Sequence, residues 1–492
     1  MSQANPGGDS TGATAARTGD GSGDLQRNLS NRHIQLIAIG GAIGTGLFMG
    51  SGKTIHLAGP SILIVYLIIG TVLLFVMRAM GEMLLFNLNY KSFQDFAGDL
   101  IGPFAGYVTG WTYWFLWIVT GMAEIIAVAG YFDFWLHDKN MAMLCAGGML
   151  LVLLGLNLMT VALFGEMEFW FALIKIVAIL GLILVGVYLI VTGFTSPAGT
   201  RSSLTHLWDH GGFFPNGIGG FMAAFQIAIF AFVGIELVGT TAAETKDPET
   251  TLPRAINSIP VRIVFFYVFS LVAIMSVTPW NEVDPEVSPF VNMFNLAGLV
   301  GAAGLMNFVV LTSASSSCNS GIFSTSRMLF GLADKCEAPA GFHKLSRHKV
   351  PANALIFSVA LIFMAFPILI VGDSIIEAFT LVTTVASILV IVIWAIILLS
   401  YMRYLKLHPE AHAQSHFKMP GAKFMPIVCL AFFALVIVLL TLEADTRTAL
   451  MYTPLWFVLL LATWPRVRKG RHNATGGAHS SATAEPAGTD GR

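Results

Sequence analysis

Charged residues are scarce in this chain. Asp, Glu, Lys and Arg make up 11% of its 492 residues, and 55% of the residues are apolar, whereas a soluble domain has about 25% charged residues. Segments of about ten residues that alternate in polarity, the mark of a membrane β-barrel, are also missing. The apolar runs are instead continuous and reach the length of about 20 residues that a helix needs to cross a bilayer. The composition therefore excludes a soluble domain and predicts an all-α membrane protein.

Cysteine is scarce as well, with four residues in the whole chain. Their spacing matches neither a disulfide framework nor a zinc site, so we predict free thiols. All twelve histidines lie outside the apolar runs or at their margins. His408, His412 and His416 follow at intervals of four and could bind a metal from one helix face, but a solvated loop is the simpler interpretation. We therefore expect no metal, no cofactor and no catalytic cluster; this disfavours a membrane-embedded enzyme, and the lack of a short filter-like loop disfavours a channel.

Twelve runs are long enough to be predicted as membrane crossings. They span residues 34–53, 62–86, 104–133, 141–163, 169–192, 218–240, 261–280, 290–325, 353–372, 374–402, 424–442 and 449–465. Residues 1–24 are rich in Gly, Ser, Thr and Ala and lack the apolar core of a signal peptide, so they are predicted as a disordered cytoplasmic tail. Residues 25–466 form one predicted twelve-helix domain, and residues 467–492 form a second cytoplasmic tail.

The distribution of lysine and arginine gives the orientation. Basic residues gather in the loops after the even-numbered crossings and in both terminal segments, whereas the opposite loops contain only Lys53, Lys139, Arg201 and Arg447. Because loops rich in Lys and Arg stay in the cytoplasm, both termini are predicted to be cytoplasmic. An even number of crossings follows.

The first crossing contains the sequence GGAIGTGLF, with four glycines in seven positions. Each glycine inside a helix costs about 1 kcal/mol relative to alanine, so a continuous helix is disfavoured there. In a membrane, broken helical backbone is tolerated only where it is buried in protein or lines a cavity. The N–H groups that a break would free at Ile43, Gly44, Thr45 and Gly46 suit a carboxylate. The alternative is that these glycines let two helices pack closely.

A second break is predicted in the sixth crossing, about 190 residues after the first. Gly234 stands there beside Glu236 in an apolar stretch, and carbonyl groups freed at Phe230, Ala231, Val233 and Gly234 could accept hydrogen bonds from an ammonium group. Five helices separate the two starts, so the second unit enters from the opposite face, as in transporters built from inverted repeats. The predicted repeats are residues 31–192 and 218–402, followed by two further helices within 424–465. A flexible packing glycine is the alternative for Gly234.

Few ionisable groups lie inside the predicted crossings, where each costs about 2.5–3.5 kcal/mol. Glu124, Lys175 and Glu236 are therefore candidates for proton coupling, because Lys175 could gain and lose a proton where a related transporter would hold a cation. A lysine that reaches the interface or a fixed ion pair is the alternative for Lys175, and a structural hydrogen bond is the alternative for Glu236. Arg78 and Glu82, four residues apart on one helix, are predicted to form a structural ion pair.

Five sequence motifs carry a resemblance to a known family. They are NRHIQLIAIGGAIGTGLFMGSGKTI, AGP, RAMGE, FVGIELVGTTAAETKDPE and FSTSRMLFGLA, which begin at Asn31, Ala58, Arg78, Phe232 and Phe323. From about Leu25 to Trp464 the chain resembles the amino acid–polyamine–organocation transporters, and among them the bacterial amino acid permeases.

The resemblance implies a twelve-helix fold of five plus five inverted helices with helices 1 and 6 broken and two helices added. It implies proton-coupled import of glycine, D-alanine and D-serine, and also of L-alanine and the analogue D-cycloserine, across the bacterial inner membrane. The backbone from Gly44 to Gly46 would hold the substrate carboxylate, the backbone from Phe230 to Val233 the ammonium group, and Lys175 the proton. The expected partners are the amino acid, protons and the bilayer, without nucleic acid. The choice of substrate rests on the resemblance alone, so a permease or exchanger for another neutral amino acid stays open.

Overall fold

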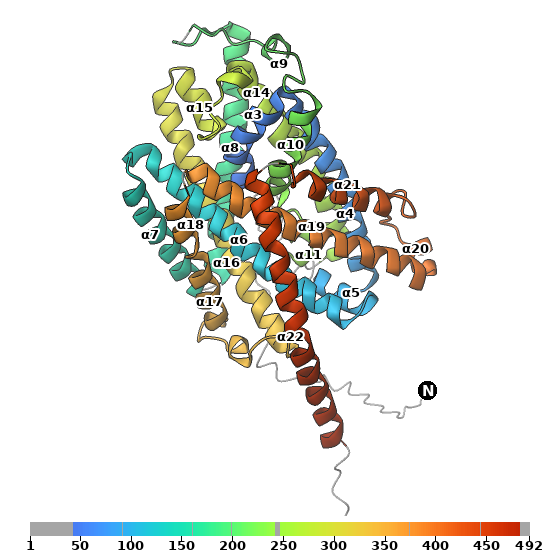
Figure 1. Cartoon of the computed structure of the whole chain (residues 1–492). Coiled ribbons are helices and arrows are strands. Elements are labelled where there is room, and N and C mark those ends of the chain that lie inside the picture. Colours follow the sequence, from blue (N-terminus) through green and yellow to red (C-terminus); the bar gives the residue numbers. More distant parts are fainter. Residues whose placement is uncertain are drawn as a thin grey trace, which may run out of the picture.

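The computed structural model describes residues 43–90, 92–159, 161–197, 199–241, 247–372, 374–442 and 444–482. These residues are helical almost throughout, and the β pairing among them is one isolated bridge between Thr195 and Arg201. Figure 1 shows the helices side by side in one elongated bundle, with the long helices running between its two ends. The prediction of an all-α protein is confirmed.

Ten helical segments are long and apolar enough to cross a membrane. They are Gly50–Phe86, Pro103–Leu136, Lys139–Leu158, Glu166–Thr192, Gly217–Gly239, Pro248–Val277, Val300–Asp334, Ala352–Val371, Ile375–Leu407 and Thr446–Lys469. A shorter apolar helix spans Met425–Leu439. The first part of the first predicted crossing, residues 34–42, lies outside the described residues, and the count of twelve crossings stays a prediction.

The elements follow one another in chain order. They are α2 (Thr45–Phe48), α3 (Gly50–Ala58), η1 (Gly59–Ser61), α4 (Ile62–Phe86), α5 (Phe93–Leu100), α6 (Pro103–Leu136), α7 (Lys139–Leu158), α8 (Val161–Thr192), α9 (His206–Asp209), α10 (Gly217–Ala228), η2 (Ile229–Phe232), α11 (Leu237–Thr241), α12 (Pro248–Asn257), α13 (Ile259–Arg262), η4 (Ile263–Phe269), α14 (Ser270–Val277), η5 (Trp280–Glu282), α15 (Pro289–Leu296), α16 (Val300–Asp334), η6 (Ala340–His343), α17 (Ala352–Ile362), α18 (Ala365–Val371), α19 (Ile375–Leu407), α20 (Pro409–Gln414), α21 (Met425–Leu439) and α22 (Ala444–Ala482).

One predicted boundary is wrong. The run 290–325 is not one helix, because α15 ends at Leu296 and α16 begins at Val300. Gly298 lies between them at φ +76°, a backbone conformation that glycine adopts without strain and that ends a helix. At the other end of the chain, α22 continues to Ala482, past the predicted start of the C-terminal tail at residue 467, and the segment of this helix that is apolar enough to cross a membrane ends at Lys469.

Helix α6 lies at the centre of the packing, against α16, α19 and α7. Small residues let neighbouring helices approach it closely, as is usual between membrane helices. A Cβ atom added at Gly121 would lie 2.7 Å from the side chain of Ile362 on α17, and one at Gly110 would lie 2.8 Å from that of Gln94 on α5. This position brings Glu124 of α6 to the middle of the bundle.

The predicted ion pair between Arg78 and Glu82 is wrong. The Glu82 carboxylate is buried and accepts hydrogen bonds from the Tyr401 hydroxyl at 2.7 Å and from the backbone N–H of Met419 at 3.0 Å. His412 Nδ1 lies 2.6 Å from the second carboxylate oxygen, while the Arg78 guanidinium stacks over a phenylalanine ring. The segment that follows α19 is thus attached near the end of α4.

The described residues contain no cluster of His, Cys, Asp or Glu that could hold a metal ion. His412 is engaged with a carboxylate rather than with its neighbouring histidines. All four cysteines are free thiols, as predicted.

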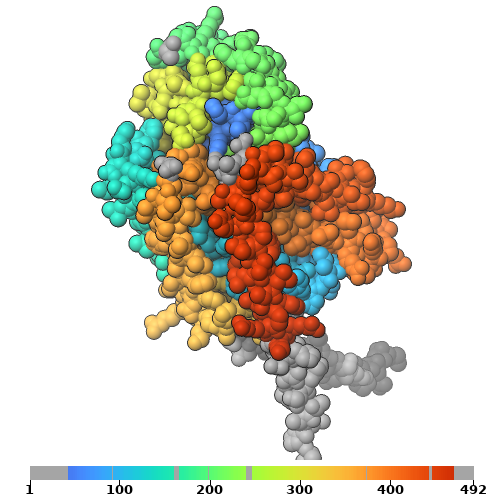
Figure 2. Space-filling model, in the orientation of Figure 1, coloured from blue at the N-terminus to red at the C-terminus, as the bar shows by residue number. Residues whose placement is uncertain are grey.

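The C-terminal helices lie against α10. Gln226 of α10 is buried; its Nε2 donates to the carbonyl of Leu439 at 2.8 Å, and its Oε1 accepts from the Thr446 hydroxyl at 3.2 Å. In Figure 2 the red atoms of the last helices form a band down the middle of the visible face. The amide of Gln226 therefore joins α10 to α21 and α22.

Candidate functional site: two broken helices

The sixth crossing is interrupted where the sequence predicts it. Helix α10 ends at Ala228, the chain continues as the 3₁₀ turn η2 to Phe232, and α11 begins at Leu237. Val233 has ψ 134° and Gly234 has φ +99°, values outside the helical range. A positive φ at Gly234 explains why glycine suits this position.

Side chains satisfy much of the interrupted backbone, as a break within a membrane requires. Both carboxylate oxygens of Glu236 accept from the N–H of Gly234 at 3.2 Å. The Tyr267 hydroxyl donates to the carbonyl of Ala231 at 2.7 Å, and the carbonyl of Phe230 accepts from a backbone N–H within the turn. Glu236 thus makes the structural hydrogen bond that was the alternative to a coupling role.

Of the segment predicted to contain the first break, the described residues begin at Ile43. Ile43 and Gly44 precede α2, Gly44 is extended at φ −122° and ψ −165°, and no side chain caps the start of α2. The carbonyl of Ile43 accepts from the Ser313 hydroxyl of α16 at 3.3 Å. The helix start at Thr45 therefore presents its first N–H groups without a partner inside the helix.

Two glycines of the first break face different neighbours. A Cβ atom at Gly46 would lie 2.5 Å from the Cα atom of Ala231 and 2.7 Å from its backbone nitrogen. A Cβ atom at Gly44 would lie 3.3 Å from Oε1 of Glu124 and 3.5 Å from the hydroxyl of Ser317. Gly46 therefore permits direct contact between the backbones of the two segments, in agreement with the alternative that these glycines let helices pack closely. Gly44 instead faces the polar side chains of Glu124 and Ser317.

The predicted ionisable residues fall into two groups. Glu124 of α6 is 2% exposed and Lys175 of α8 is fully buried, and the two side chains attract each other electrostatically. Oε2 of Glu124 and the hydroxyl of Thr45 have no hydrogen-bond partner among the described residues. Glu236 lies in the other group, where Tyr113 and Trp394 face its carboxyl group. Lys175 and Glu124 therefore lie together near the first break, and Glu236 belongs to the second.

Comparison with known proteins decides the family. The model of the family described as amino acid permease matches residues 33–472. The chain belongs to this amino acid permease family. It is 62% identical over 447 residues to the D-serine/D-alanine/glycine transporter of Escherichia coli strain K12, covering 91% of this chain and 95% of that protein.

More distant relatives extend the comparison. The amino-acid permease AapA of Bacillus subtilis is 51% identical over 449 residues, covering 91% of this chain and 96% of the relative. The DL-alanine permease SerP2 of Lactococcus lactis is 43% identical over 448 residues, covering 90% and 96%. The chain is thus a membrane transporter of the amino acid permease type.

One buried carboxylate of the permease escaped the sequence reasoning. Glu168 of α8 is fully buried, and the Ser316 hydroxyl of α16 lies 3.0 and 3.1 Å from its two oxygens. The predicted crossing began at residue 169 and so placed Glu168 in a loop. Glu168 stands seven residues before Lys175, which places the two residues two turns apart on the same helix face. This spacing was the signal in the sequence that the two side chains share a buried surface.

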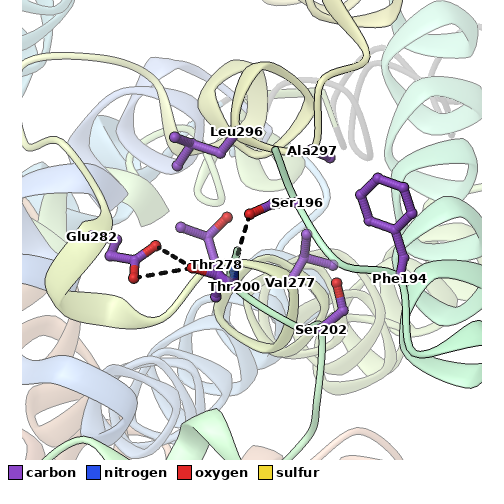
Figure 3. Close-up of a pocket in the computed structure, with 9 residues that line it drawn as sticks. All are labelled: Phe194, Ser196, Thr200, Ser202, Val277, Thr278, Glu282, Leu296 and Ala297. Carbon is purple, nitrogen blue, oxygen red and sulfur yellow. Dashed lines mark hydrogen bonds between the residues drawn. The ribbon is translucent and has the colours of Figure 1, made fainter. Parts of the chain in front are cut away.

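A small pocket of the permease lies elsewhere, between the chain that follows α8 and the ends of α14 and α15 (Figure 3). It is lined by Phe194, Ser196, Thr200, Ser202, Val277, Thr278, Glu282, Leu296 and Ala297. The Thr200 hydroxyl donates to the Glu282 carboxylate at 3.3 Å, and the Thr200 N–H donates to the Ser196 hydroxyl at 3.2 Å. None of the residues of the two breaks lines this pocket.

Proposed function

We propose that this permease imports small neutral amino acids by alternating access, driven by protons. Its proposed substrates are glycine, D-alanine and D-serine, with L-alanine and D-cycloserine as further ones. The observation that carries the proposal is the 62% identity, over 91% of the chain, to a protein named a D-serine/D-alanine/glycine transporter. An exchanger or a permease for another neutral amino acid is the competing function.

The proposed architecture has twelve crossings in the bacterial inner membrane with both termini in the cytoplasm. Ten long apolar helices, the shorter α21 and the start of a broken first helix support the number. Two broken helices five crossings apart support five plus five inverted helices, residues 31–192 and 218–402, with α21 and α22 added.

The proposed substrate site lies where the two breaks meet. The N–H groups from Ile43 to Gly46 receive the carboxylate, because helix starts carry partial positive charge. The backbone from Phe230 to Gly234 receives the ammonium group. The close approach of Gly46 to Ala231 supports a small substrate, because two backbones this near leave little space for a side chain.

The proposed proton carriers are Lys175, Glu124 and Glu236. Lys175 is fully buried and two carboxylates, Glu168 and Glu124, act on it electrostatically, which supports its role. Glu124 connects this lysine to the substrate site, because its carboxylate lies against Gly44 of the first break. The ionised carboxylate of Glu236 accepts a hydrogen bond from the N–H of Gly234. Binding of a proton to Glu236 therefore changes the hydrogen bonding of the backbone at the second break.

The test uses the purified permease in proteoliposomes. Labelled glycine should accumulate when the outside is more acidic than the inside, and unlabelled D-alanine, D-serine, L-alanine and D-cycloserine should compete. Lys175→Met should retain exchange of labelled for unlabelled glycine but lose accumulation driven by the pH gradient. If accumulation by the wild type requires unlabelled amino acid inside the vesicles and does not require the pH gradient, the permease is an exchanger. Undiminished accumulation by Lys175→Met would remove that residue from the coupling mechanism.

A further inference from the structure

We infer that Glu168 is a proton-coupling residue, which receives the proton from Lys175 and releases it on the cytoplasmic side. This inference rests on the proposed proton coupling. Glu168 and Lys175 are both fully buried and stand two turns apart on α8, about 10.5 Å along the axis. Side chains on a helix lean toward its N-terminus, and Glu168 lies on that side of Lys175.

Charge favours this pairing. The carboxylates of Glu168 and of Glu124 on α6 both attract the Lys175 ammonium group electrostatically. Lys175 is in turn the charged group that acts on Glu168 among the described residues. The lysine therefore interacts with one carboxylate that lies against Gly44 and with another two turns toward the start of α8.

One face of α16 connects the two ends of this path. Ser313 donates to the carbonyl of Ile43 at the first break, Ser316 donates to Glu168, and Ser317 faces Glu124. Ser320, one turn beyond Ser316, also faces Glu168. Residues three, four and seven apart share a helix face, so a continuous row of hydroxyl groups leads from the substrate site to Glu168.

The polar row continues toward the end of α7. Asn157 of α7 donates to Oδ1 of Asn319 at 2.7 Å. The hydroxyl of Ser320 and Oδ1 of Asn157 are buried and have no hydrogen-bond partner among the described residues. Buried polar atoms of this kind are usual where water enters a protein interior. Positive-inside orientation places the end of α7 and the start of α8 on the cytoplasmic side.

The transfer balances in atoms and charge. An N–H bond of the Lys175 ammonium breaks and an O–H bond forms on the Glu168 carboxylate, which leaves a neutral amine and a neutral acid. Glu168 then gives its proton to cytoplasmic water and becomes a carboxylate again. Lys175 takes the next proton from the outer side through Glu124, and the ion pair is restored. An unpaired lysine charge is costly inside a membrane. The Glu168 carboxylate avoids this cost because it pairs with the Lys175 ammonium group.

The experiment compares two activities of one preparation. Exchange of labelled for unlabelled glycine moves no net protons, whereas accumulation in a pH gradient requires them, and a pH dye inside the vesicles reports proton entry. Glu168→Gln should exchange within about twofold of wild type, accumulate at least tenfold less glycine, and admit glycine without protons. Glu168→Asp should restore part of the accumulation, and the nearby exposed Glu166→Gln is the matched control that should behave as wild type.

Each outcome decides one question. Wild-type accumulation by Glu168→Gln overturns this inference and leaves the proposed function intact. Equal loss of exchange and accumulation in a folded Glu168→Gln, judged by its unfolding temperature, assigns Glu168 a structural role and also overturns it. Should Glu168→Gln not fold, Glu168→Asp decides: unchanged proton entry per glycine overturns the inference, and reduced proton entry supports it. Absence of gradient-driven accumulation in wild type refutes proton coupling itself.

Discussion

The contact between the two breaks makes Gly46→Ala the most informative single substitution. The added methyl group would lie 2.5 Å from the Cα atom of Ala231, about 0.9 Å closer than the 3.4 Å at which ordinary contact begins. The obstacle is backbone and cannot rotate away as a side chain can. Overpacking typically costs about 1–3 kcal/mol, and a backbone obstacle belongs at the upper end of that range.

Helix propensity works in the opposite direction. Gly46 lies inside α2, where alanine is favoured over glycine by about 1 kcal/mol. The net cost is therefore about 2 kcal/mol, which reduces the population with both breaks in contact about 30-fold. Initial rates of glycine uptake should fall by a similar factor.

Gly50→Ala is the matched control for this substitution. Gly50 begins α3, and its added methyl group would lie 3.4 Å from Ile227 and 3.7 Å from Phe379, which are ordinary contacts. This variant should transport as wild type does and unfold at an equal or higher temperature. Labelled glycine uptake and thermal unfolding in detergent measure both variants. Equal uptake and equal unfolding temperatures for Gly46→Ala and Gly50→Ala would refute the close contact.

Two further substitutions test the hydrogen bonds that hold the second break and the segment after α19. Tyr267→Phe removes the donor to the buried carbonyl of Ala231 and should lower the free energy of unfolding by about 0.6–1.7 kcal/mol; an unchanged unfolding temperature would contradict that hydrogen bond. His412→Ala removes one partner of the buried Glu82 carboxylate and should cost about 1.5–3 kcal/mol, with faster proteolysis of the loop after α19. The exposed His416→Ala should match wild type in both assays, and equal behaviour of the two histidine variants would argue against the attachment.

The second break could be predicted from the sequence because its cause, like that of the predicted first break, is local. Glycine at Gly234 permits a positive φ, and a run of glycines around Gly44 weakens the first helix whatever surrounds it. The start of α16 could not be predicted in this way. The residues on both sides of Gly298 are apolar, so hydropathy did not separate a short helix from the crossing that follows it.

A contact between segments that are distant in the sequence explains another difference between the prediction and the structure. Glu82 meets His412 across 330 positions of sequence, and nothing near Arg78 indicates that a later loop supplies the partner. Glu168 was missed for another reason, because a boundary drawn one residue late removed it from the membrane. Element ends are the least certain part of a sequence-based prediction, and here one residue decided whether a buried carboxylate was considered.

The amide of Gln226 has a consequence for how movement at the second break can be observed. It lies two residues before the end of α10 and binds both the last turn of α21 and the start of α22. These C-terminal helices have exposed outer faces, and they are attached to α10 through a side chain rather than through the interrupted backbone. A spectroscopic probe on the outer face of α21 would thus report displacement of α10 from a position outside the proposed substrate site.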